Sequence, residues 1–128
     1  MLGRLGEKLA AKHLSRNGYK VIYRNFRPRG GGEVDIVCRD KTADTLAFVE
    51  VKTRSSNEFA DPASAVNREK RELIARGARA WLHMLDNPDI FFRFDIVEVL
   101  MVPEEKPEIN VIKSAFTMPK PFHYAAQS

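Results

Sequence analysis

The sequence predicts a single α/β domain in which helices flank a mixed β-sheet. Apolar residues recur at three- and four-residue steps in residues 2–17 and 66–85, the spacing of amphipathic helices. Further segments are rich in β-branched and aromatic residues or alternate polar with apolar positions, which is typical of strands. The expected order is helix, three strands, helix and two strands, and this order favours a layered α/β arrangement.

Length and composition agree with one globular domain. The chain has 128 residues, of which 44% are hydrophobic and 30% charged, which excludes a disordered or fibrous protein. No apolar run approaches the roughly 20 residues that span a bilayer, so we expect no membrane partner. Cys38 is the only cysteine, which excludes an internal disulfide and favours a reducing cytoplasm. We expect residues 1–118 to form the domain and residues 119–128 to be a flexible tail.

The first half of the chain is expected to hold one helix and three strands. Gly18 offers a stop for the helix, whose small residues would let it lie close to a sheet. The strands are expected at Lys20–Phe26, Glu33–Arg39 and Leu46–Thr53. The second strand alternates, with Val34, Ile36 and Cys38 expected on one side and Glu33, Asp35 and Val37 on the other.

The second half is expected to hold one helix and two strands. Pro62 suits the first turn of the helix, although the regular pattern runs from Val66 to Leu85. Its inner stripe is expected to consist of Val66, Leu73, Ile74, Gly77, Ala78, Trp81 and Leu85. The two strands are expected at Phe91–Leu100 and Ile109–Phe116.

Two ionisable residues stand in a strand that is otherwise typical of a core. Glu50 and Lys52 flank Val51, so both project to one face, about 6.6 Å apart along the strand. Asp35 lies in the preceding strand. If the two strands pair as a hairpin, they lie about 4.8 Å apart. Asp35, Glu50 and Lys52 could then share one patch.

Such a patch suits cleavage of a phosphodiester. Two adjacent carboxylates repel each other, and a divalent cation such as Mg²⁺ or Mn²⁺ relieves the repulsion and lowers the pKa of an attacking water. A lysine can orient that water or stabilise the developing anion. An E-x-K triplet occurs by chance in about one of every two or three chains of this length. The triplet is informative here because it lies at the end of a buried strand and follows a strand that contains an aspartate. From the residues alone, an exposed Glu–Lys salt bridge with Asp35 capping a turn remains an equal alternative.

The distribution of charge favours a polyanionic partner. The net charge is +4, and cations gather in the loop around residues 24–29 and in residues 68–79. The candidates for holding backbone phosphates are Arg27, Arg29, Arg54, Lys70 and Arg71. An ordinary surface position is an equal alternative for Arg54, as is a lysine that reaches past the sheet edge to water for Lys70. Glu33 could be a further metal ligand, but a solvated strand start is favoured.

Several motifs occur in a characteristic order: GRLGEKLAAKHL, GYKVIYRNFR, GGEVDIV, FVEVKTR, REKR, RFDIV and INVIKSAF. Together they resemble the YraN-like bacterial family, which is similar to archaeal Holliday junction resolvases and to the restriction-endonuclease-like PD-(D/E)xK superfamily. The resemblance covers most of the chain and implies that superfamily's core fold. It places Asp35 and Glu50 at the positions of the metal ligands and Lys52 at that of the catalytic lysine. Glu7 matches a helix-one glutamate of the resolvase-like branch, whereas Val34 departs from the proline of the motif.

Three functions fit these observations. We expect a Mg²⁺- or Mn²⁺-dependent endonuclease that hydrolyses DNA, including branched or other non-standard structures, with Asp35, Glu50, Lys52 and Glu7 as its site. The alternative is a non-catalytic nucleic-acid-binding module on a nuclease fold, which would gain little from adjacent buried carboxylates. The third is an interaction protein with a structural acidic patch. Phe91 and Phe92 hint at a homodimer interface.

Overall fold

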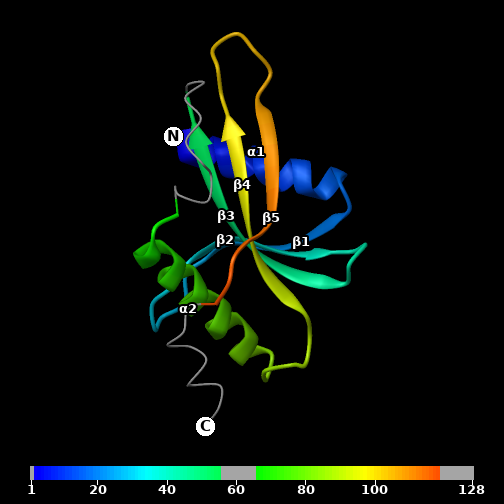
Figure 1. The fold of residues 1–128 in the computed structure, drawn as a ribbon, viewed down its shortest axis with the longest axis vertical. Helices are drawn as coiled ribbons and strands as arrows, with labels where there is room; N and C mark the ends of the chain where they lie inside the picture. Colours follow the sequence, from blue (N-terminus) through cyan, green and yellow to red (C-terminus); the bar gives the residue numbers. More distant parts are fainter. Residues whose placement is uncertain (1, 56–65, 119–128) are drawn as a thin grey trace.

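The computed structural model describes residues 2–55 and 66–118 as a three-layer α/β fold (Figure 1). A five-stranded sheet lies between two helices, one on each face. The elements are α1 (Leu2–Arg16), β1 (Tyr19–Phe26), β2 (Val34–Asp40), β3 (Thr45–Arg54), α2 (Arg68–Met84), β4 (Phe92–Leu100) and β5 (Glu108–Phe116). The predicted element order and mixed sheet are confirmed, and they agree with the core that the resemblance implies. In the described part of the chain, no helix is long and apolar enough to cross a membrane.

The strands lie in the order β1-β2-β3-β4-β5. The first three form an antiparallel meander, β3 and β4 are parallel, and β5 returns antiparallel to β4. A parallel neighbour needs a crossover, and α2 lies within the one that joins β3 to β4. The helix runs back along the sheet, so its first turns lie near the end of β3 that carries Glu50 and Lys52.

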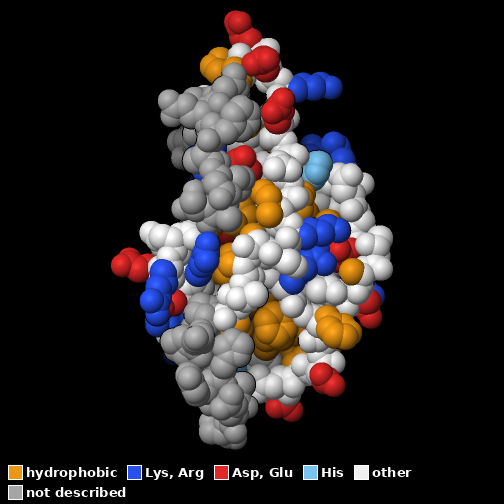
Figure 2. All heavy atoms as spheres, in the orientation of Figure 1, with side chains coloured by type: hydrophobic (Ala, Val, Ile, Leu, Met, Phe, Trp, Pro, Cys, Tyr) orange, Lys and Arg blue, Asp and Glu red, His pale blue; other side chains and the backbone are white. Residues whose placement is uncertain are grey.

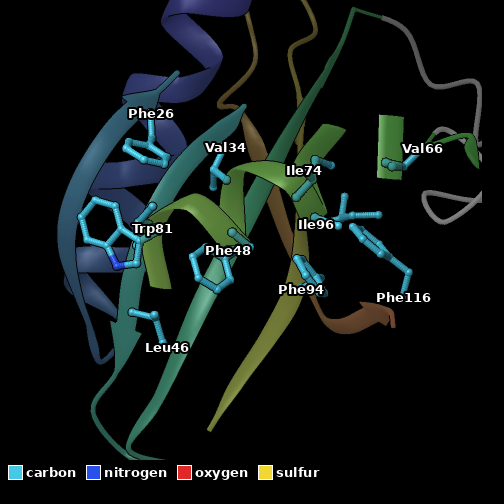
Figure 3. Packing of buried hydrophobic residues seen from close by; sticks show 13 residues of the cluster. Phe26, Val34, Leu46, Phe48, Val66, Ile74, Trp81, Phe94, Ile96 and Phe116 are labelled. Carbon is cyan, nitrogen blue, oxygen red and sulfur yellow. The ribbon is translucent and has the colours of Figure 1, made fainter. Parts of the chain in front are cut away.

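Each face of the sheet has its own apolar cluster. On the α2 face, Trp81 packs edge-on against Phe26 with ring centroids 5.2 Å apart, and Phe94 stacks on Phe116 at 4.9 Å (Figure 3). On the α1 face, the buried side chains include Ala10 and Leu14. The helix lies close because its residues are small. A Cβ on Gly6 would fall 1.9 Å from the Oγ1 atom of Thr53.

Some details of the sequence prediction are wrong. Val34 packs in the α2-face cluster with Val37 rather than with Ile36 and Cys38, because β2 pairs with β3 only from Ile36 onward and need not alternate before that point. Leu73 and Leu85, which were expected on the inner stripe of α2, are exposed. Ala75, which was not expected there, is buried. Leu85 is exposed because it is already the C-cap of α2. Pro62 and the expected tail lie outside the described residues.

Candidate functional site

The candidate site lies where the second half of β3 meets the start of α2. Ile36 pairs with Val49 at the end of the β2–β3 ladder, so Asp35 and Glu50 each lie one residue beyond the last paired positions of the two strands. The Oδ2 atom of Asp35 accepts a hydrogen bond from the backbone N–H of Val51 at 2.8 Å, which fixes this carboxylate against β3. The structure therefore brings the predicted acids together on adjacent strands.

Glu50 is a buried carboxylate with an unmet bonding requirement. Its residue is 3% exposed, and its Oε1 atom has no hydrogen-bond partner among residues 2–55 and 66–118. Burial, followed by the charge of nearby Asp35 and a side-chain hydrogen bond with it, raises the pKa of Glu50 to about 8, although Lys70 and Lys52 oppose that rise. The bond with Asp35 requires that one of the two acids keeps its proton, whereas with both ionised no described donor reaches Oε1. A buried polar atom without a partner costs free energy, so Oε1 marks a position where a cation or donor would be stabilising.

Two lysines face the other oxygen of the same carboxylate. The Nζ atoms of Lys52 and Lys70 each lie 3.7 Å from Oε2 of Glu50. Both side chains remain about one third exposed, at 31% and 28%, so they can reach solvent while Glu50 cannot. The predicted grouping of Glu50 with Lys52 is present, and α2 adds Lys70 to it.

Glu33 links the loop before β2 to α2. Its carboxylate forms ion pairs with Arg27 and with Lys70, and its backbone N–H donates to the carbonyl of Leu73 at 3.0 Å. The hydrogen bond from Lys70, against the effect of burial, lowers the pKa of Glu33. The favoured expectation of a solvated strand start is therefore wrong, because the ion pairs hold this side chain in place.

Glu7 approaches the site from α1. Burial, followed by the charge of Asp35, raises the pKa of Glu7, and Arg24 and Arg27 oppose the rise. No cluster of three or more His, Cys, Asp or Glu side chains able to hold a metal ion occurs within the described part of the chain. Within the candidate site, Asp35 and Glu50 are two neighbouring carboxylates rather than a cluster of three ligands. Mg²⁺ is commonly held by one or two carboxylates and retained waters, so this pair, with the unpartnered Oε1, fits such an ion.

The predicted phosphate-binding residues divide into two groups. Arg27 and Arg29 are exposed, and Figure 2 shows Lys and Arg side chains gathered over α2. By contrast, Arg54 forms an ion pair with Glu98 at 2.6 Å. Arg71 donates from Nε to the carbonyl of Val66 at 2.9 Å and lies over the ring of Phe116. These two arginines are partly buried against internal partners, whereas Arg27, although it pairs with Glu33, keeps a side chain that is 57% exposed.

The sequence interpretation missed a second charged group on the α1 face. Asp40 and Asp95 are 2% and 0% exposed, and Arg93 bonds to them at 2.8 and 2.9 Å. The Tyr19 hydroxyl also accepts from Arg93, at 3.0 Å. The sequence does contain an indication of this group, because Asp95 interrupts the apolar segment RFDIV in the same way that Glu50 interrupts FVEVK.

Comparisons with known proteins point to one family. The model described as "Uncharacterised protein family UPF0102" matches residues 6–99, a span that includes every candidate catalytic residue. A UPF0102 protein of Nocardia farcinica is 47% identical over 115 residues, 90% of this chain and 88% of its own length. One of Trichlorobacter lovleyi is 43% identical over 117 residues, 91% of each chain. One of Geobacter sulfurreducens is 44% identical over 118 residues, 92% of this chain and 90% of its own. The chain therefore belongs to the UPF0102 (YraN-like) family.

Proposed function

We propose that this protein is a metal-dependent endonuclease that hydrolyses DNA phosphodiesters. The observation that most supports the proposal is the Glu50 carboxylate, which is buried beside Asp35 and faces Lys52 with one oxygen, while its other oxygen has no donor among residues 2–55 and 66–118. Bringing two ionised acids together beneath a helix is unfavourable, and the repulsion is relieved either by a proton that one of them keeps or by a cation that joins them. A salt bridge that served the fold alone would need only one of the two acids.

Each member of the group has a distinct role in the proposed reaction. Asp35 and Glu50 would hold Mg²⁺ or Mn²⁺, with Glu7 supporting them from α1. The bound ion supplies a water of lowered pKa and offsets the charge of the phosphate. Lys52 lies at the solvent-facing side of Glu50, where its ammonium orients the attacking water and stabilises the developing oxyanion. The oxygen of the water adds to phosphorus as the water releases a proton to solvent, the bond from phosphorus to the leaving sugar oxygen breaks, and that oxygen takes a proton from solvent.

DNA is the proposed substrate because the cations near the site suit a phosphate backbone. Arg27 and Arg29 are exposed on the loop before β2, and Lys70 reaches the site from α2. Backbone contacts position a duplex without reading its sequence, so selection by structure, as at branched DNA, is the form of specificity proposed here. Phe91 is 79% exposed and Phe92 37%, and a two-fold dimer through them would suit a two-stranded substrate.

The test is incubation of purified protein with linear, supercoiled and four-way-branched DNA in Mg²⁺, Mn²⁺ or EDTA. Glu50→Gln and Lys52→Met should each lower the cleavage rate on the order of 100-fold or more, as expected when a metal ligand or an oxyanion-stabilising charge is lost. Lys41→Met is the matched control, since Lys41 is exposed in the turn between β2 and β3. It should cleave as the wild type does.

The outcomes separate the three functions. Cleavage that persists in both site variants would come from a contaminant and would end the enzyme proposal. Salt-dependent DNA binding without cleavage on any substrate would instead support the binding module. Absence of both cleavage and binding would leave the interaction protein.

A further inference from the structure

Charged side chains of alternating sign run from solvent into the candidate site. In order they are Arg27, Glu33, Lys70, Glu50 and Lys52, joined by four successive ion pairs. The side chain at the outer end is 57% exposed, and that of Glu50 is 4% exposed. The chain of ion pairs therefore connects an exposed arginine to the proposed metal ligand.

Lys70 is shared unequally between two carboxylates. Its Nζ atom donates a hydrogen bond to Oε1 of Glu33, whereas it lies 3.7 Å from Oε2 of Glu50, beyond hydrogen-bond length. Lys70 is thus bound to Glu33 and only electrostatically paired with Glu50.

Glu33 is held firmly enough to position that lysine. The loop before it packs directly on α2, because a Cβ on Gly32 would lie 2.4 Å from the backbone nitrogen of Gly77, and Gly32 has a φ of +101°. The backbone N–H of Glu33 donates a hydrogen bond to the carbonyl of Leu73, which lies one turn along α2 from Lys70. Backbone contacts therefore fix the main chain of Glu33 beside Lys70 independently of the ion pair.

A divalent ion at Asp35 and Glu50 would meet two ammonium groups close to Oε2. Like charges at such distances repel, so Lys70 must lean away from Glu50 for the ion to bind well. We infer that Glu33 is a positioning residue that raises the affinity of the Asp35–Glu50 pair for a divalent ion by holding Lys70, without contacting the ion itself. This inference rests on the proposed function.

A competing role for Glu33 is that of a third metal ligand, and a double-mutant cycle separates the two roles. Mn²⁺ binding is measured from the free-ion signal in electron paramagnetic resonance for the wild type, Glu33→Gln, Lys70→Met and the double variant. Glu33→Gln should raise the Mn²⁺ Kd about fivefold, the scale of one partly exposed ion pair. In the Lys70→Met background the same change should alter the Kd by less than about twofold, since Lys70 is no longer present.

The controls use variants of the same chemistry. Glu72→Gln removes an acid from α2 that pairs with Arg68 rather than Lys70, and it should leave the Kd unchanged. Lys70→Gln repeats the cycle with a polar side chain, and circular dichroism checks that each variant is folded.

Two results would overturn the inference while leaving the proposed function intact. An equal loss of affinity from Glu33→Gln with and without Lys70 would identify Glu33 as a ligand. An unchanged Kd in the Glu33→Gln single variant would show that Lys70 does not compete with the ion. A wild-type protein that binds no Mn²⁺, or binds it equally after Glu50→Gln, would overturn the metal site as well.

Discussion

Replacement of Glu50 by glutamine tests whether the buried acid is held at a cost to the fold. The substitution keeps the shape of the side chain and removes its charge. We expect the metal-free variant to be more stable than the wild type at alkaline pH, and nearly equal to it near pH 5. A stabilising loss of charge is unusual for a site residue that merely supports the structure, because most substitutions of buried residues destabilise.

The size of the change in the free energy of unfolding follows from the raised pKa of Glu50. Burial, followed by the neighbouring Asp35, raises the pKa of Glu50 from 4.5 to about 8, and each tenfold change in proton affinity corresponds to about 1.4 kcal/mol. Between these two pH values the folded protein keeps a proton that the unfolded chain has released, so the free energy of unfolding falls as pH rises. The wild type should lose up to about 4 kcal/mol across this window, whereas glutamine carries no such proton.

The assay is urea unfolding in EDTA at pH 5, 6.5 and 8.5, followed by the fluorescence of Trp81, the single tryptophan of the chain. Mg²⁺ in place of EDTA should stabilise the wild type at pH 8.5 and leave Glu50→Gln unchanged. Glu98→Gln is the matched control, because this acid pairs with Arg54 at 2.6 Å and its loss should destabilise. The reasoning is refuted if Glu50→Gln is the less stable protein at pH 8.5, or if its difference from the wild type does not vary with pH.

Two further substitutions test how the fold supports the site. Gly32→Ala should destabilise by roughly 2–4 kcal/mol, since its Cβ would overlap the backbone of α2 at a positive φ; Gly30→Ala, with nothing within 4 Å, should show little change in the same urea titration. Asp95→Asn should cost roughly 3 kcal/mol by removing one of the two buried carboxylates that pair with Arg93. Asp44→Asn, in an exposed pair, should cost less than about 1 kcal/mol, and equal losses in the two aspartate variants would contradict the argument.

Local periodicity accounts for most of the fold that could be predicted. The first helix was expected to end at residue 17 and ends at Arg16, and the fourth strand was expected from Phe91 and begins at Phe92. Alternation along β3 likewise placed Glu50 and Lys52 on one face. These successes share a cause, because each depends on side chains that lie within a few residues of one another along the chain.

The parts that could not be predicted depend on how separate elements dock. Lys70 meets Glu33 only because the loop before β2 packs on α2, and they are 37 positions apart in the chain. Arg54 finds Glu98 through the parallel pairing of β3 with β4, again a contact between distant segments. For Arg54 and Lys70 the sequence left phosphate binding and an ordinary surface position as equal alternatives. These contacts show which internal partners each residue has.

Two strands of this sheet carry the same sequence signature, a charged residue within an apolar run, and the structure treats them differently. Asp95 accepts hydrogen bonds from Arg93 and from the backbone N–H of Ser114, so its burial is compensated within the protein. Glu50 keeps an oxygen without a partner in the described part of the chain and lies beside a second acid. Buried polar groups in folded proteins are normally satisfied, and strongly perturbed acids cluster at functional sites. Satisfaction by hydrogen bonds from donors, rather than burial of charge, is therefore the criterion that separates the structural group around Asp95 from the candidate catalytic group around Glu50.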